Sequence, residues 1–207
     1  CSNIFTQIGW GSHNYHSAYK QLPTHMTGTQ PGTGRRVPGP WFTFSDQGNR
    51  LRLSMLVPVL PFVEQQALWE QISNPNAERT DGNLSASIGT PTNPWPPMGP
   101  TPDRIQYKPW FTEIPTYRCP SDPGVGLPAL GRTNYGASLG DSMWLIHVAP
   151  YNNNRTRITA GRARHARAAH RGFFKPLQES KFRDTLDGLS NTIAMGEMIT
   201  ALQDGDK

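Results

Sequence analysis

The hydrophobic pattern at the start of the chain predicts a helix over residues 3–19. Apolar and small residues recur there every three or four positions, on one stripe of a 3.6-residue period: Ile4, Ile8, Gly11, Tyr15 and Ala18. Gly9 and Gly11 lower the intrinsic helix propensity, so we expect this helix to depend on packing against a sheet. The Leu22-Pro23 pair ends it, because the residue before a proline avoids the helical region.

The remaining hydrophobic pattern predicts short elements. Residues 51–57 alternate apolar and polar side chains, which predicts a half-buried strand, and Pro61 begins a short helix that continues to Ile72. Further short extended segments are predicted at 114–119, 134–138, 143–148, 172–174 and 192–199. This order predicts an α+β fold, with the N-terminal helix packed on a mainly antiparallel sheet.

Composition adds long irregular loops to this picture. The 207 residues include 20 glycines and 20 prolines, and residues 27–40 and 73–109 are the segments that we expect to be loops. Only 35% of the residues are hydrophobic, but a chain of this length buries roughly 70% of its unfolded surface, so we expect a core within one domain over residues 1–207. No apolar run is long enough for a transmembrane helix, and no sustained heptads indicate a coiled coil.

Positive charge is concentrated in one part of the chain. The net charge is +5, and no acidic residue lies between Asp141 and Glu179. Six arginines fall in this stretch: Arg155, Arg157, Arg162, Arg164, Arg167 and Arg171. They form either a solvated, mobile loop or a patch for an anionic partner such as an acidic polysaccharide. No aromatic residue lies between the arginines, so the stacking surface typical of a single-strand nucleic-acid binder is missing.

Two groups of side chains have the chemistry of metal ligands. His13 and His16 are three residues apart on the first predicted helix, a spacing that permits joint metal binding or simple packing. Asp184, Asp187 and Glu197 are weak calcium candidates, because carboxylate oxygens are the ligands that calcium prefers. The alternative for Asp187 is a hydrogen-bonded turn in which Gly188 adopts a positive φ.

Signatures of catalysis are missing from the sequence. It contains no Gly-x-Ser-x-Gly elbow, no His-Glu-x-x-His, no phosphate-binding Gly-x-x-x-x-Gly-Lys and no dinucleotide fingerprint. We therefore expect a protein that is not an enzyme and holds no cofactor.

The two cysteines leave alternatives open. The chain begins with Cys1, which suits either the lipidated cysteine of a lipoprotein or a chain that starts after a hydrophobic segment. Cys1 and Cys119 are too far apart in sequence for a zinc-ligand pair, so they are either free thiols or one disulfide.

Five blocks, in chain order, carry a family resemblance. They are C-S-N-I-F-T-Q-I-G at 1–9 with H-N-Y-H at 13–16, L-V-P-V-L-P-F-V-E-Q at 56–65, C-P-S-D at 119–122, N-Y at 134–135 and D-G-L-S-N-T at 187–192. Together they resemble the DUF1559 family of planctomycete-type prepilin-like, or pseudopilin-like, proteins. The resemblance covers nearly the whole chain.

The resemblance implies a type IV pilin-like fold. In that family a prepilin cleavage site and a membrane helix stand before the position of Cys1, so the first helix would continue a long pilin-type helix. The family's C-terminal His-x9-Asp-Gly element is absent, because Asp204-Gly205 has Ala194 where the histidine would stand.

The resemblance also implies a function and a location. We expect an exported, non-enzymatic subunit of an extracellular fibre or secretion-type pseudopilus, anchored in the membrane only through the missing helix. Its partners would be other pilin-like subunits or secretion machinery. The alternative is a cell-surface binding module that recognises an anionic polymer or glycan through its loops. Export implies an oxidising compartment, and hence a disulfide between Cys1 and Cys119.

Overall fold

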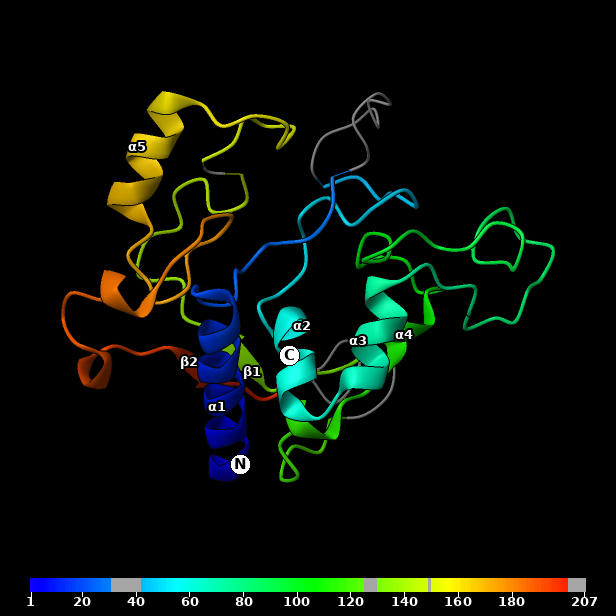
Figure 1. Cartoon of the computed structure of the whole chain (residues 1–207), viewed down its shortest axis with the longest axis horizontal. Helices are drawn as coiled ribbons and strands as arrows, with labels where there is room; N and C mark the ends of the chain where they lie inside the picture. Colours follow the sequence, from blue (N-terminus) through cyan, green and yellow to red (C-terminus); the bar gives the residue numbers. More distant parts are fainter. Residues whose placement is uncertain (31–41, 125–129, 149, 201–207) are drawn as a thin grey trace.

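The predicted N-terminal helix is present in the structure. The structure, a computed structural model, describes residues 1–30, 42–124, 130–148 and 150–200. Helix α1 spans Ser2–Tyr19, and Figure 1 shows it in blue with the N-terminus at its lower end. Its buried residues are Ile8, Gly11 and Ser12. The helix ends at Lys20, whose left-handed backbone (φ 60°) turns the chain away.

The inner face of α1 packs on a second helical segment. Helix α2 (Leu56–Val59) runs directly into the 3₁₀ helix η1 (Leu60–Val63), and α3 (Gln66–Ser73) follows. A Cβ placed on Gly11 would lie 2.8 Å from a methyl group of Val59 and 2.8 Å from one of Val63. Gly11 therefore lets α1 approach this segment closely, as its small size suggested.

Two glycines of α1 give a paired prediction about this contact. Gly9→Ala should raise the free energy of unfolding by about 0.5–1 kcal/mol, because alanine favours the helix and its Cβ would meet no atom within 4 Å. Gly11→Ala should lower it by about 1–2 kcal/mol, because the added methyl overpacks the contact with α2 and η1. Urea unfolding of both variants measures the difference. Equal effects at the two positions would show that α1 does not pack as described.

The main core lies between α1, the α2–η1–α3 segment and the strands. Its buried side chains come from all parts of the chain and include Ile8, Leu22, Met55, Val59, Leu60, Ile72, Tyr117, Tyr135 and Phe174. A smaller cluster of Ile88, Trp95 and Tyr107 lies within residues 73–109, the segment that the composition predicts to be a loop. That long segment is irregular as expected, but it has a small core of its own.

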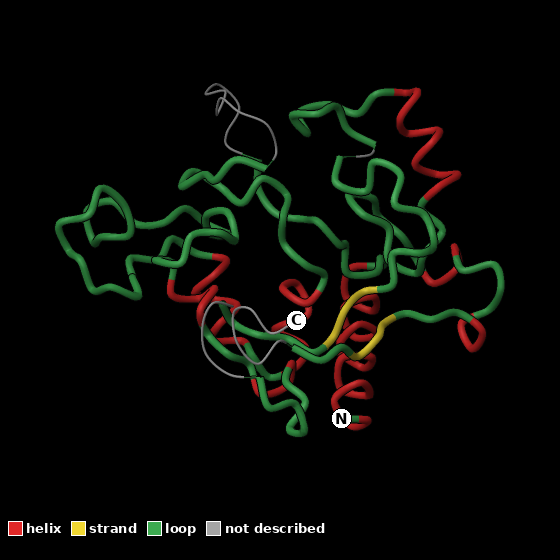
Figure 2. The backbone as a smooth tube through the Cα atoms, turned by 180° about the vertical axis from the view of Figure 1, so that it is seen from behind, coloured by secondary structure: helices red, strands yellow, loops and turns green. Residues whose placement is uncertain are grey.

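The sheet is smaller than predicted. Strands β1 (Tyr135–Ala137) and β2 (Met195–Glu197) pair antiparallel, with Gly136 opposite Gly196. Figure 2 shows them in yellow beside α1. The α+β class is therefore confirmed, but in the described residues the sheet has only these two strands.

Three predicted strands were wrong. In 51–57 only Leu53 forms a bridge, to Thr27, because the proline-containing segment that follows turns into α2. In the segment 143–148, residues 144–148 form turns, and 172–174 form bends although the Phe174 N–H donates to the Ser138 carbonyl. A fourth segment, 114–119, contains a 3₁₀ helix, η2 (Pro115–Tyr117), because proline suits the first helical position.

The remaining elements are short. They are α4 (Lys108–Phe111), α5 (Ala160–Ala169), and the 3₁₀ helices η3 (Phe182–Asp184) and η4 (Leu189–Asn191). Within the described ranges, no helix combines the length and apolarity needed to cross a membrane.

Candidate functional site

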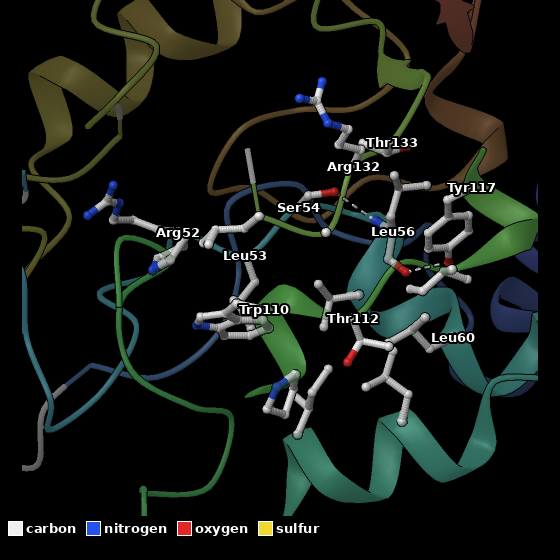
Figure 3. Close-up of a pocket in the computed structure, with 18 residues that line it drawn as sticks. Arg52, Leu53, Ser54, Leu56, Leu60, Trp110, Thr112, Tyr117, Arg132 and Thr133 are labelled. Carbon is white, nitrogen blue, oxygen red and sulfur yellow. Dashed lines mark hydrogen bonds between the residues drawn. The ribbon is translucent and has the colours of Figure 1, made fainter. Parts of the chain in front are cut away.

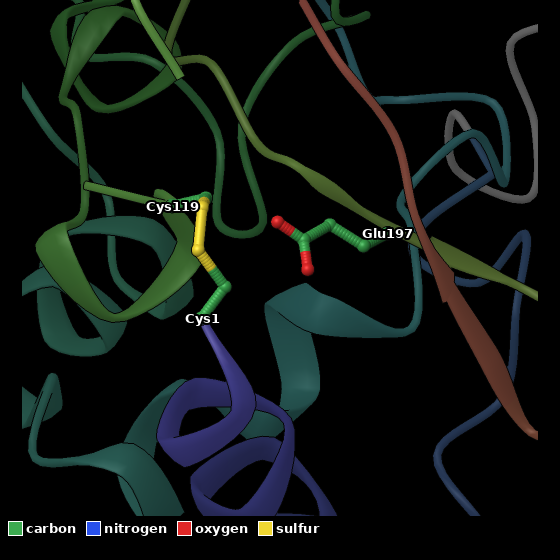
Figure 4. Close-up of side chains that lie close together, drawn as sticks. All are labelled: Cys1, Cys119 and Glu197. Carbon is green, nitrogen blue, oxygen red and sulfur yellow. A yellow bond between two sulfur atoms is a disulfide. The ribbon is translucent and has the colours of Figure 1, made fainter. Parts of the chain in front are cut away.

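A disulfide joins the start of α1 to the rest of the fold. Cys1 and Cys119 are bonded through their Sγ atoms, with their Cα atoms 5.1 Å apart, which confirms the pairing that the family resemblance implied. Figure 4 shows the bond beside the first turn of α1. Because the Cys1 sulfur is used in this bond, it cannot at the same time carry the thioether of a lipidated cysteine.

Asn134, at the entry to β1, connects the disulfide loop to the C-terminal strand. Its side chain is buried, and its Oδ1 accepts the backbone N–H of Cys119 at 2.8 Å. Its Nδ2 donates to the Met198 carbonyl at 2.9 Å, and its backbone carbonyl accepts the Met198 N–H at 2.8 Å. The C-P-S-D and N-Y blocks therefore meet in space and hold β2 in register.

Asp122 completes this network. Its Oδ1 accepts the Gly124 N–H at 2.9 Å, and its Oδ2 accepts both the N–H and the hydroxyl of Thr200 at 2.9 Å. The same Oδ2 accepts from Asn134 Nδ2. The side chain is only 3% exposed, and these hydrogen bonds, led by the backbone N–H groups, hold the pKa of Asp122 well below its usual range.

The lowered pKa of Asp122 predicts a loss of stability in acid. A carboxylate with a depressed folded pKa stabilises the protein above its unfolded pKa of about 4, and this contribution is lost as the pH falls through the folded value. Asp122→Asn should therefore flatten the pH dependence of unfolding below about pH 4. Urea titrations across this range measure it, with exposed Asp187→Asn as the control. An unchanged slope in the Asp122 variant would refute the role assigned to this carboxylate.

The calcium candidates do not form one site. The Asp184 carboxylate accepts the Lys181 N–H at 2.8 Å within η3. The Asp187 carbonyl accepts from the Asn191 amide at 3.2 Å, and Gly188 has φ 86°, so this segment is the hydrogen-bonded turn with positive φ. Glu197 instead lies over the disulfide (Figure 4).

Glu197 lies close to the two disulfide-bonded cysteines rather than to Asp184 and Asp187. Its carboxylate and the sulfurs of Cys1 and Cys119 lie within 4.8 Å of one another, the only such group among the described residues. The two sulfurs are bonded to each other and offer no thiolate, so this group lacks the ligand set of a metal centre.

The two histidines of α1 pack against an aromatic ring. The ring centroids of His13 and His16 lie 4.6 Å and 4.5 Å from that of Phe182. This arrangement corresponds to the packing alternative for the His-x-x-His spacing, and it places Phe182 of η3 against α1.

The middle of the basic stretch is a helix rather than a loop, which corrects the first interpretation for residues 160–169. Helix α5 carries Arg162, Arg164 and Arg167, and Figure 1 shows it at the upper edge of the molecule. Arg162 donates to the Tyr151 carbonyl at 2.9 Å, and Arg171 pairs with Asp141. Three other candidate anion-binding arginines are exposed on or near α5. Among the described residues, their side chains make no comparable hydrogen bond or ion pair: Arg157, Arg164 and Arg167.

Arg155 has a different role from its neighbours, which corrects its assignment as an anion-binding candidate. It is only 1% exposed, and its guanidinium donates to the carbonyls of Arg50 (2.7 Å), Leu51 (3.0 Å) and His147 (2.8 Å). Burial lowers the pKa of Arg155 to about 10, which leaves it charged at neutral pH. Arg155 therefore joins two distant loops and presents no charge to a partner in solution.

A hollow bordered by α2, η1, α3 and α4 was not predicted from the sequence. It has a volume of about 260 Å³, and its walls are mainly apolar (Figure 3), with Leu53, Leu56, Leu60, Trp110, Ile114 and Leu130 among the lining residues. The Tyr117 hydroxyl at its edge donates to the Leu56 carbonyl at 2.7 Å, and burial raises the pKa of Tyr117. Thr112 donates to the Lys108 carbonyl at 3.3 Å. These wall groups are used internally, so the hollow suits an apolar group rather than a reacting polar one.

Comparison with known proteins places this α+β fold with its disulfide-bound helix in a family. The whole chain, residues 1–207, matches the family described as "Protein of unknown function (DUF1559)", and the chain belongs to that family. No curated protein and no solved structure matches the chain.

Proposed function

We propose that this chain is the head domain of a non-enzymatic, pilin-like or pseudopilin-like subunit that assembles outside the cytoplasm. The observation that carries the proposal is α1. One face of this 18-residue helix is buried against the core, and large side chains on the opposite face are exposed. This two-faced helix is what a subunit needs if its helix both holds the head and contacts neighbouring subunits.

The outer face of α1 carries a large apolar side chain. Trp10 is 67% exposed, although its neighbours on the helix, Ile8 and Gly11, are buried. Tryptophan is enriched at protein interfaces, because it buries a large area at a low cost in side-chain entropy. Trp10 is therefore the residue of α1 that we expect to contact an adjacent subunit.

The disulfide supports the same proposal mechanically. It fixes the residue just before α1 to the loop before Asp122, so the helix start cannot fray away from the head. In an assembled subunit, a pull on this helix would be transmitted through the covalent bond to the core. This proposal includes export, because the bond persists in an oxidising compartment.

Complementation of cells that lack the gene tests the proposal. Trp10→Glu should remove the subunit from the sheared extracellular fraction while leaving its level in whole cells unchanged. Leu84→Glu, at a side chain that is 74% exposed on a distant loop, is the matched control and should assemble normally. Wild-type amounts of the Trp10 variant in the sheared fraction would count against the interface.

Helix α5 favours a second candidate function, the binding of an anionic polysaccharide. Arg164 and Arg167 are exposed on it, and the ring of neighbouring His165 stacks on Trp144 at 5.3 Å. No acidic residue lies between Asp141 and Glu179 to oppose an anionic polymer. A glycan would find cationic and aromatic groups together there.

Heparin chromatography checks this second function. Arg164→Gln/Arg167→Gln should lower the salt concentration needed for elution, because two exposed charges no longer contact the polyanion. Lys20→Gln/Arg183→Gln changes the net charge equally at exposed sites elsewhere and is the control. Equal shifts in both variants would indicate only a net-charge effect.

A further inference from the structure

Apolar side chains are unusually exposed around the C-terminal strand. Five large ones lie within fourteen residues: Leu186 (93% exposed), Leu189 (48%), Ile193 (74%), Met198 (52%) and Ile199 (87%). Single exposed apolar residues are normal on a protein surface, but five within so short a segment are more than scattered exposure explains. Strand β2 lies within this group.

One edge of β2 has unused backbone hydrogen-bonding groups. The Ala194 carbonyl and the Met198 N–H bond to residues flanking β1, and Gly196 is paired with Gly136. Because alternate residues of a strand point their N–H and C=O groups to opposite edges, those of Met195 and Glu197 face away from β1. Among the described residues, none hydrogen-bonds to these outward groups. Such an edge is a template for another strand.

The sequence of this segment is nearly symmetric about Gly196. It reads I-A-M-G-E-M-I over residues 193–199, with isoleucine at both ends and glycine at the centre. If a second copy pairs antiparallel with Gly196 opposite Gly196, then Ile193 lies opposite Ile199, and Met195 lies opposite Glu197. In this register, the residues whose backbone N–H and C=O groups face away from β1 lie opposite the same kind of residue in the second copy. An antiparallel ladder requires this arrangement. No pair of like charges is opposed.

Gly196 has no evident role within the single chain. A Cβ added there would meet no atom within 4 Å, and its φ lies outside the left-handed region that favours glycine. Glycine weakens a strand, and it often marks a place where another backbone approaches closely. A two-fold axis at Gly196 supplies such a backbone.

We infer that this edge binds a second copy of the chain, through antiparallel pairing of β2 with β2 about a two-fold axis at Gly196. The pairing joins the two small sheets into one and covers Ile193 and Ile199 of both copies. An isologous contact of this kind closes as a dimer. It does not depend on the pilin-like role, because it uses a different surface from α1.

Sedimentation of the whole chain tests the pairing. Wild-type protein should show a dimer with twice the monomer mass of 23.0 kDa. Ile193→Lys/Ile199→Lys places like charges opposite each other and should weaken association by roughly tenfold or more. Ile193→Lys/Ile199→Glu places opposite charges in the same register and should restore the dimer. Leu84→Lys, at a side chain that is also 74% exposed, should leave the mass unchanged.

Cysteine cross-linking tests the register itself. Gly196→Cys should give a covalent dimer on mild oxidation, since the paired Cα atoms would be about 4.5 Å apart. Ile193→Cys alone should not, because its two copies would be ~20 Å apart along the strands. A monomeric wild-type protein, a dimer that survives Ile193→Lys/Ile199→Lys, or cross-linking through residue 193 instead of 196 would each overturn the inference.

Discussion

Removing the Cys1–Cys119 disulfide should lower the free energy of unfolding by about 4–5 kcal/mol. The bond closes a loop of 118 residues in sequence, so its loss restores a large conformational freedom to the unfolded chain. In the folded protein, the first turn of α1 would lose its covalent link to the head and fray. The change is Cys1→Ala/Cys119→Ala, and urea unfolding with hydrogen exchange along α1 measures both effects.

Two controls separate the bond from side-chain packing. Wild-type protein under reducing conditions should show the same loss as the double variant, whereas Cys1→Ala alone leaves one free thiol at Cys119, which is 5% exposed. Thiol titration of unreduced, denatured wild-type protein should find no free thiol. A loss of stability below about 1 kcal/mol would mean that α1 is held by packing alone.

Arg155→Met should cost about 3–5 kcal/mol, because it leaves the carbonyls of Arg50, Leu51 and His147 buried without their donor. Methionine fills much of the space but donates no hydrogen bond, so the loss reports the polar contacts. Arg157→Met, at an exposed position two residues on, should change stability by no more than about 0.5 kcal/mol. Thermal and urea unfolding of the two variants gives the comparison.

The same pair of variants separates stability from binding. Arg155→Met should leave heparin retention unchanged at a temperature where the variant remains folded, since its guanidinium is buried. Equal stability of both variants, or weaker heparin retention in the Arg155 variant alone, would show that Arg155 reaches solvent.

Helix α1 could be predicted from the sequence because a stripe of five positions repeats over its length. The strands could not be placed with the same security, since β1 and β2 have three residues each and are too short for a period to show. Residues 51–57 have strand-like alternation, yet Leu53 finds only Thr27 as a partner, and the prolines that follow favour helical turns. Tertiary contacts outweigh a short local pattern in such segments.

The candidate site, too, could be predicted from the sequence only in part. The Cys1–Cys119 pairing followed from the family resemblance, since the residues alone left free thiols open. The burial of Arg155 is not visible in the sequence, because two of its carbonyl partners are 104 and 105 residues away. The apolar hollow draws its walls from segments between Arg52 and Thr133, so no single motif marks it.

Electron microscopy of native cells, with and without the gene for this chain, tests the pilin-like role most directly. The proposal predicts surface filaments or pseudopili that bind antibodies against this head domain, that disappear when the gene is deleted, and that return with the wild-type gene but not with Trp10→Glu. Filaments that persist unchanged in the deletion strain would contradict it.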